Sequence, residues 1–229
     1  MKILKIEQNS EEWMEWRRPN IGGSDSKDVK PLSRGKLKGL PEGSAGFWKL
    51  LAGKVAIDKD DESDRDRGHR LEATNLEKTN EKTGLSMVQG NVWISDYSKF
   101  IHISPDGADE GDQPKNAFEG KSFDTHKHLM IIYFDLLAKE ELDYNPVDSL
   151  PKDNQDQAIK YFAVNEDLEV LHWALFNDFV AIPGLDHYII TIKREDVIDL
   201  IETQKDIELD ALEKRDEIIE FLRNKIGDK

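Results

Sequence analysis

The chain has 229 residues and no cysteine, with 38% hydrophobic and 34% charged residues. This composition is typical of one sizeable α/β domain, or two small ones, and it excludes disulfides, thiolate metal sites, iron–sulfur clusters and cysteine nucleophiles. The formal charge of −15 counts mildly against DNA binding, although 32 Lys and Arg residues are enough to line one cleft. The early charges exclude a signal peptide, no apolar run predicts a membrane span, and we expect a cytoplasmic protein.

The first third of the chain is predicted to be helical. Ser10 is an N-cap candidate for a short helix that ends near Arg18, and Ser24 is an N-cap candidate for a second. Apolar residues at helical spacing predict a third helix over residues 45–56. A charged run leads into a fourth helix that ends near Gly84.

Alternating and β-branched residues predict strands further along. These are residues 87–94 and 99–103, joined by a turn at 96–98, then 116–122, 169–176 and 187–192. Helices are predicted over 128–137, where a buried strand is the alternative, over 155–164, and as one long amphipathic helix from 195 onward. This order predicts an α/β fold with a central mixed β-sheet flanked by helices. We expect a single domain over residues 1–229, with N-terminal helices in 1–57, the core in 58–193 and the C-terminal helix in 194–229.

The residues with the clearest chemical meaning are Asp106, Glu119 and Lys121. Asp106 ends one predicted strand, while Glu119 and Lys121 lie two residues apart on the next and therefore point to the same face. A hairpin would place Asp106 beside them. Carboxylate oxygens suit Mg²⁺, and a lysine can orient or deprotonate an attacking water. The pattern predicts a metal-dependent phosphodiester hydrolase.

The same pattern also arises by chance, because the chain contains 47 Asp and Glu residues. The alternative is an acidic turn followed by a solvated strand with an ordinary Glu–Lys pair. Phe118 and Phe123 flank the pair and predict a partly buried strand. Charged side chains are costly to bury, so their presence on such a strand favours a functional role.

Four segments together resemble the phage lambda exonuclease and YqaJ-like viral recombinase family, which belongs to the PD-(D/E)xK nuclease superfamily. They are residues 12–17 with 21–24, residues 67–72, residues 104–107 with 119–121, and Gln157, seven residues before Val164. Three features differ from the family pattern. The spacing between Asp106 and Glu119 is longer and acidic, Gly22-Gly23 stands in place of Thr-Ala, and Ser122-Phe123-Asp124 replaces the proline-containing turn after the lysine. The resemblance implies a restriction-endonuclease-like core.

The resemblance also implies roles for individual residues. Asp106, Glu119 and the Gly120 carbonyl would bind Mg²⁺, for which Mn²⁺ could substitute. Lys121 would act on the water, with Glu72 near the metal and Gln157 supporting the lysine or the water. Arg17 and Ser24 would hold a 5′-phosphate, which agrees with the anion affinity of a helix N-terminus beside an arginine.

By resemblance, the function is 5′-to-3′ degradation of double-stranded DNA, which leaves 3′ single strands for phage-type DNA recombination. The implied partners are a single-strand annealing protein and two further copies in a ring-shaped homotrimer, in the host cytoplasm if a phage encodes the chain. Two alternatives stay open: a PD-(D/E)xK endonuclease or single-strand nuclease, and a non-catalytic acidic protein that mimics DNA.

Other polar and aromatic residues are predicted to be structural. His126 and His128 are expected at a helix start rather than as metal ligands, and His69 at the surface. Trp13 and Trp16 are expected in the core, with stacking on a DNA end as the alternative.

Overall fold

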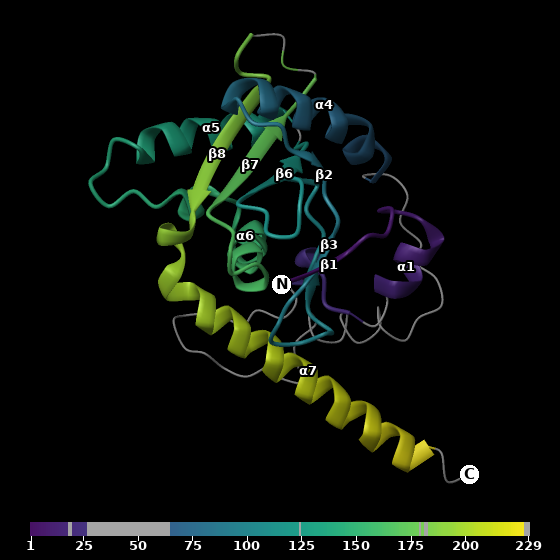
Figure 1. Ribbon diagram of the computed structural model, residues 1–229. Helices are drawn as coiled ribbons and strands as arrows, with labels where there is room; N and C mark the ends of the chain where they lie inside the picture. The colour runs from purple at the N-terminus through teal and green to yellow at the C-terminus, as the bar shows by residue number, and fades with distance from the viewer. Residues whose placement is uncertain (18–19, 27–64, 124, 179, 181–182, 227–229) are drawn as a thin grey trace.

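The computed structural model describes residues 1–17, 20–26, 65–123, 125–178, 180 and 183–226 (Figure 1). The helix predicted over residues 45–56 lies outside these ranges. The helices are α1 Glu11–Arg17, α4 Arg65–Thr83, α5 Thr125–Ala138, α6 Lys152–Val164 and α7 Ile198–Ile226, with 3-10 turns at Gly23–Asp25, Pro146–Ser149 and Arg194–Asp196. The strands are β1 Lys2–Leu4, β2 Val88–Gln89, β3 Val92–Ile94, β4 His102–Ile103, β5 Gly107–Ala108, β6 Asn116–Lys121, β7 Val170–Phe176 and β8 His187–Lys193.

The central feature is a five-stranded mixed sheet with the order β2-β5-β6-β7-β8. Strands β6 and β7 are parallel, and every other neighbouring pair in this sheet is antiparallel. A smaller antiparallel sheet has the order β1-β3-β4. The predicted α/β class with a mixed sheet is therefore confirmed.

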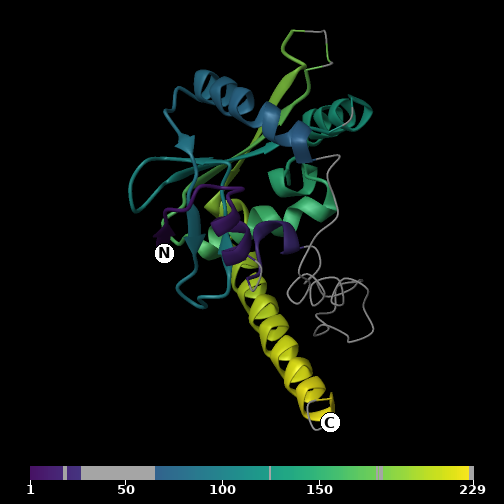
Figure 2. The same ribbon diagram turned by 90° about the vertical axis from the view of Figure 1, so that its right-hand side faces the viewer.

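Two helices cover opposite faces of the large sheet (Figure 1). On one face α4 packs against β6 and β7, where buried Asn75 donates to the backbone carbonyl of Ala174 at 3.1 Å. On the other face α6 contacts the side chain of Glu119 from β6. Helix α7 packs along α6 with its first half, and its C-terminal end extends away from the other elements (Figure 2). This arrangement places β6 between two helices.

Gly90 explains why one predicted strand is divided. The sequence predicted a continuous strand over 87–94, which was wrong: β2 belongs to the large sheet and β3 to the small one. A Cβ on Gly90 would lie 2.2 Å from the backbone oxygen of Pro105, so only glycine allows these two segments of the chain to approach this closely. This close approach holds the turn before Asp106.

Helices α1, α4, α6 and α7 and strands β6, β7 and β8 agree with the predictions, and the helical alternative for residues 128–137 is confirmed by α5. The strand predicted over 99–103 is shorter in the structure, as β4 His102–Ile103, and β5 was not predicted. The chain from 195 onward forms the short Arg194–Asp196 turn and then α7 without interruption. Strand β1 was not predicted, because its three residues form a strand only by pairing with β3. Among the described helices, none is long and apolar enough to cross a membrane.

Candidate active site

Strand β6 carries the proposed catalytic pair. Its alternation places Phe118 and Gly120 toward α4, where a Cβ on Gly120 would lie 3.0 Å from the Asn75 amide nitrogen. Glu119 and Lys121 consequently point to the other face, toward α6. The Lys121 ammonium donates to Oε1 of Glu119 at 2.5 Å, which confirms the predicted common face.

Glu119 is almost fully buried and accepts hydrogen bonds at both carboxylate oxygens. Oε1 accepts from Lys121 and from the Gln157 amide at 2.6 Å, and Oε2 accepts from the Tyr161 hydroxyl. Gln157 also accepts from Lys121 at 3.3 Å through its amide oxygen. A buried carboxylate with three donors is held in one position, because turning it away would leave the donors unpaired.

Asp106 lies beside this group because it directly precedes β5, which forms a hairpin with β6. The expected hairpin partner, the strand predicted over 99–103, was wrong: its residues 102–103 form β4 in the smaller sheet. Its Oδ2 accepts from the backbone N–H of Gly120 at 2.8 Å. Burial, followed by the negative charges of Glu119 and Glu72, raises the pKa of Asp106 well above its ordinary value. Lys121 and the Gly120 N–H act in the opposite direction and do not cancel this effect.

Glu72 reaches the site from α4. Burial raises its pKa, while the nearby charge of Glu119 adds to that rise and His69 opposes it. The His69 ring nitrogen lies 3.4 Å from the Glu72 carboxylate, so His69 pairs with this acid at the edge of the site. The structure therefore brings Glu72, Asp106, Glu119, Lys121 and Gln157 together from four segments that are distant in sequence.

The donor chemistry fits a hard divalent cation. Carboxylate oxygens are the ligands that Mg²⁺ and Mn²⁺ prefer, and like-charged acids in mutual contact are stabilised when a cation lies between them. Burial is the largest cause of the raised pKa of Asp106, and the negative charges of Glu119 and Glu72 add to it. Within the described ranges, no three acidic or histidine side chains are already arranged around one ion position. As placed, the oxygens of Glu119 are bound by protein donors instead.

Arg17 and Ser24 form a separate polar group next to a tight turn. The Arg17 guanidinium donates to the hydroxyl of Ser24, so these two predicted phosphate-binding residues do meet. The expectation that Ser24 is a helix N-cap was wrong: it lies within the 3-10 turn Gly23–Asp25, whose N-cap is Gly22. Asp25 takes the capping role because its carboxylate accepts from the Gly22 N–H at 2.9 Å.

The structure also places the remaining candidates. His128 is fully buried and its Nε2 lies 2.6 Å from the Leu185 carbonyl oxygen, while the side chain of His126 lies outside the described part. Trp13 is buried, as expected. Trp16 is only half-buried, so the expectation that it lies in the core was wrong; it packs edge-on against His102, with ring centroids 4.5 Å apart.

Two residues of the site were missed from the sequence. Tyr161 follows Gln157 by one helical turn, so the spacing on a predicted helix could have revealed it. Trp173 lies opposite Glu119 in the β6–β7 register, and the Lys121 ammonium lies 4.9 Å from its ring centroid. No sequence signal indicates this contact, because strand register is a property of the fold.

Comparison with known proteins gives the family of the chain. The YqaJ-like viral recombinase domain matches residues 12–164, which is well over half of the sequence. The chain belongs to the YqaJ-like viral recombinase family. The match begins in α1 and ends with α6, so it spans every residue of the site described above except Trp173. No curated protein matches the sequence.

Solved structures show which fold this family member has. An alkaline exonuclease from Laribacter hongkongensis, LHK-Exo, is 18% identical with a TM-score of 0.70, covering 96% of this chain and 99% of its own, and its complex with dAMP matches equally. A phage-related exonuclease from Haemophilus somnus 129PT is 14% identical with a TM-score of 0.63, covering 89% and 96%. The chain therefore has the alkaline exonuclease PD-(D/E)xK fold. Family and fold together support a phage-type nuclease.

Proposed function

We propose that this YqaJ-like protein is a divalent-metal-dependent exonuclease that degrades double-stranded DNA from a 5′ end. The proposal rests on the surroundings of Glu119, which is buried between the Lys121 ammonium, the Gln157 amide and the Tyr161 hydroxyl. Asp106, directly before the neighbouring strand β5, accepts from the Gly120 N–H beside it. A solvated Glu–Lys pair on an ordinary strand would need none of these partners. The non-catalytic reading is correspondingly weaker, since a DNA mimic has no use for a lysine there.

The roles of the residues follow from their chemistry. Asp106 and Glu119 would bind Mg²⁺, with Mn²⁺ as a substitute, together with the Gly120 carbonyl and with Glu72 nearby. The bound ion would stabilise negative charge on the scissile phosphate. Lys121 would orient the attacking water, and its position over Trp173 would keep the ammonium at the carboxylates. Gln157 and Tyr161 would keep Glu119 oriented.

The end preference would come from Arg17 and Ser24. A guanidinium and a hydroxyl in contact present several donors, and a terminal phosphate offers matching acceptors with two negative charges. Anchoring the 5′-phosphate there would place the adjacent phosphodiester at Asp106 and Glu119, so that cleavage proceeds in the 5′-to-3′ direction. The products would be 3′ single strands for a single-strand annealing protein.

We further propose a single nuclease domain over residues 1–229, in a cytoplasmic homotrimer. The formal charge of −15 favours this assembly, because a ring can place its basic groups on an inner channel and its acids outside. An endonuclease or a single-strand nuclease built on the same centre is the second candidate.

The test is digestion of linear, 5′-phosphorylated duplex DNA with Mg²⁺. The native protein should remove duplex, and Lys121→Ala should abolish this. Lys115→Ala, which replaces an exposed lysine just before the same strand, should leave activity intact. Cleavage of closed circular DNA would favour the endonuclease reading. Absence of any cleavage by folded native protein would overturn the proposal in favour of the interaction protein.

A further inference from the structure

A buried ion pair joins α6 to α7. Lys160 and Glu208 are both fully buried, and the lysine Nζ lies 3.0 Å from the glutamate Oε1. Removing two charges from water is costly, and well-packed apolar residues often serve stability equally well in such places. The pair therefore calls for an explanation beyond stability.

Lys160 has a second set of partners, in the segment before the 3-10 turn. Its ammonium donates to the backbone oxygen of Ile21 at 2.9 Å and to that of Gly22 at 3.3 Å. The N–H of Ile21 donates to the Phe100 carbonyl at 3.0 Å, and the N–H of Gly22 donates to Asp25 at 2.9 Å. All four backbone polar groups of these two residues are therefore bound, and Lys160 binds both carbonyls.

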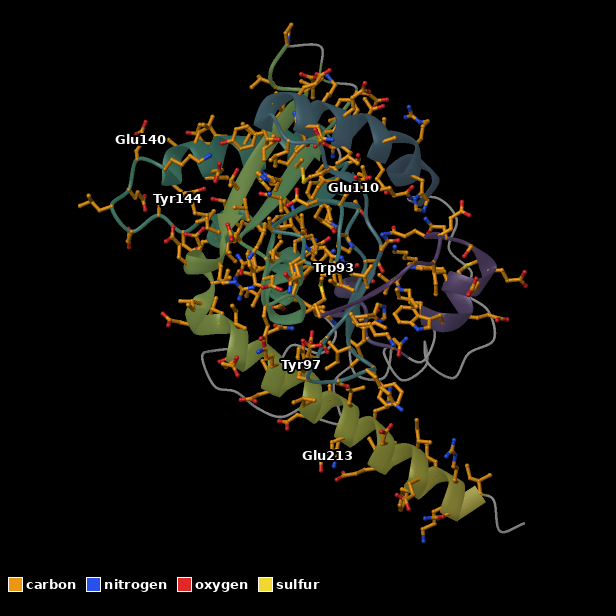
Figure 3. All side chains as sticks on the ribbon, in the orientation of Figure 1. Trp93, Tyr97, Glu110, Glu140, Tyr144 and Glu213 are labelled. Atoms are coloured by element: carbon orange, nitrogen blue, oxygen red, sulfur yellow. The ribbon has the colours of Figure 1, made fainter. Side chains whose placement is uncertain are left out.

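Glu208 is fixed as firmly on its own side. Gln204 donates to its Oε1 at 2.9 Å, and the Tyr97 hydroxyl donates to Oε2 at 2.8 Å. Burial and the charge of Glu208 raise the pKa of Tyr97, so the phenol remains a donor at every working pH. Tyr97 lies against α7 at the turn between β3 and β4 (Figure 3). The glutamate thus supplies the counter-charge for the Lys160 ammonium in the interior.

The position of Lys160 on α6 links two parts of the site. The same helix carries Gln157 and Tyr161, which hold Glu119. Lys160, between them in sequence, holds the carbonyls of Ile21 and Gly22. The backbone that continues from Gly22 forms the turn containing Ser24, and Ser24 accepts from Arg17. One rigid helix therefore sets the span from the Arg17–Ser24 group to the catalytic glutamate.

We infer that Lys160, with Glu208 as its counter-charge, is a positioning residue for recognition of the 5′-phosphate end. It holds the turn so that a phosphate bound at Arg17 and Ser24 places the adjacent phosphodiester at Glu119. This inference rests on the proposed function. Displacing a bound group by about 1 Å can lower a reaction rate on the order of a hundredfold. Loss of the Lys160 support should therefore slow cleavage at 5′-phosphorylated ends, while the catalytic groups themselves stay intact.

The test uses the paired variant Lys160→Met/Glu208→Gln, which removes both charges and leaves no unpaired ion in the interior. The measured quantity is the ratio of kcat/KM for 5′-phosphorylated duplex to kcat/KM for 5′-hydroxyl duplex. We expect the ratio to fall about tenfold or more, through a lower kcat on the phosphorylated end, with kcat on the 5′-hydroxyl end nearly unchanged. Circular dichroism and thermal unfolding establish that the variant is folded.

Two further variants separate positioning from general stabilisation. Lys205→Met removes a different ion pair between α7 and Glu166, 3.1 Å apart, and should leave the ratio at the native value. Arg17→Ala should lower the ratio, and adding it to the paired variant should lower the ratio little further, since both changes act through one phosphate contact.

The outcomes distinguish this inference from the function on which it rests. A native protein that cleaves DNA without any preference for a 5′-phosphate would overturn the phosphate anchor, and the inference with it. A native protein with that preference, and a folded paired variant that retains it in full, would overturn the inference alone. Additive effects of Arg17→Ala and the paired change would also overturn it.

Discussion

The hydroxyl of Tyr161 donates a hydrogen bond to the catalytic candidate Glu119, from a position one helical turn beyond Gln157. Burial and the negative charges of Glu119 and Asp106 raise the pKa of Tyr161 well above its ordinary value, so the side chain remains a protonated donor. The tyrosine and the glutamine therefore donate hydrogen bonds to the two different oxygens of the Glu119 carboxylate.

Tyr161→Phe should lower kcat about 10- to 100-fold, because partners that orient a metal-binding carboxylate typically have effects of this size. The concentration of Mg²⁺ at half-maximal rate should rise in the same variant. Tyr144→Phe is the matched control, since that hydroxyl donates to Asp135 instead. A normal kcat with normal Mg²⁺ dependence in Tyr161→Phe would show that Glu119 needs no support.

Arg17→Glu should reduce the preference for 5′-phosphorylated over 5′-hydroxyl ends by about tenfold or more, since a charge-assisted contact is replaced by repulsion. Competition between the two duplexes in one reaction measures the preference directly. Arg223→Glu carries the same charge change in the last turn of α7 and should have no such effect. An unchanged preference in Arg17→Glu would remove the phosphate role from this arginine.

Gly90→Ala should lower the free energy of unfolding by about 3 kcal/mol, at the upper end for overpacking, because the new methyl group meets the backbone of Pro105 rather than a side chain that can move. Nuclease activity should fall as well, since Asp106 follows that proline directly. Chemical denaturation with activity measured on the same samples checks both effects. Gln89→Ala, at an exposed neighbouring position, should change neither stability nor activity. If Gly90→Ala has native stability, the segments at Gly90 and Pro105 can move apart to accommodate the methyl group.

His187 should make stability depend on pH above pH 4. Burial, followed by the charges of Lys82 and Lys78, lowers the pKa of His187 to about 4 from an ordinary value of 6.5. The unfolded chain therefore binds a proton between these values while the folded chain does not, and stability is lost as the pH falls from 6.5 to 4. The loss should be on the order of 2 kcal/mol.

Denaturation midpoints at pH 7, 5.5 and 4.2 measure this loss. His187→Asn should reduce the dependence in that window without abolishing it, because burial also lowers the pKa of His172 from 6.5. The stability of the variant at pH 7 should fall through loss of the contact with Thr79, 3.1 Å from Nε2. The lowered pKa of Asp135 acts at lower pH, because its ordinary value is 3.8, and does not interfere. An equally steep dependence in the variant would assign the effect to other groups.

The sequence alone determined the local elements and the chemical identity of the site. Spacing by two on a strand placed Glu119 and Lys121 on one face. Periodicity predicted α7, because an amphipathic pattern reflects which face a helix buries. The position of Asp106 beside the pair depends on β5, which the sequence did not predict. The resemblance added Glu72 and Gln157, which no local pattern would have selected.

Only the tertiary structure decided which residues support that site. Tyr161 lies 42 positions from its partner Glu119 in the sequence, and Trp173 lies 52 positions from Lys121. Lys160 and Glu208 are 48 positions apart. Strand register and helix docking set those contacts, and both depend on packing of the whole core rather than on neighbouring residues. The division of residues 87–94 at Gly90 has the same origin, since the close approach of Pro105 is a contact between distant parts of the chain.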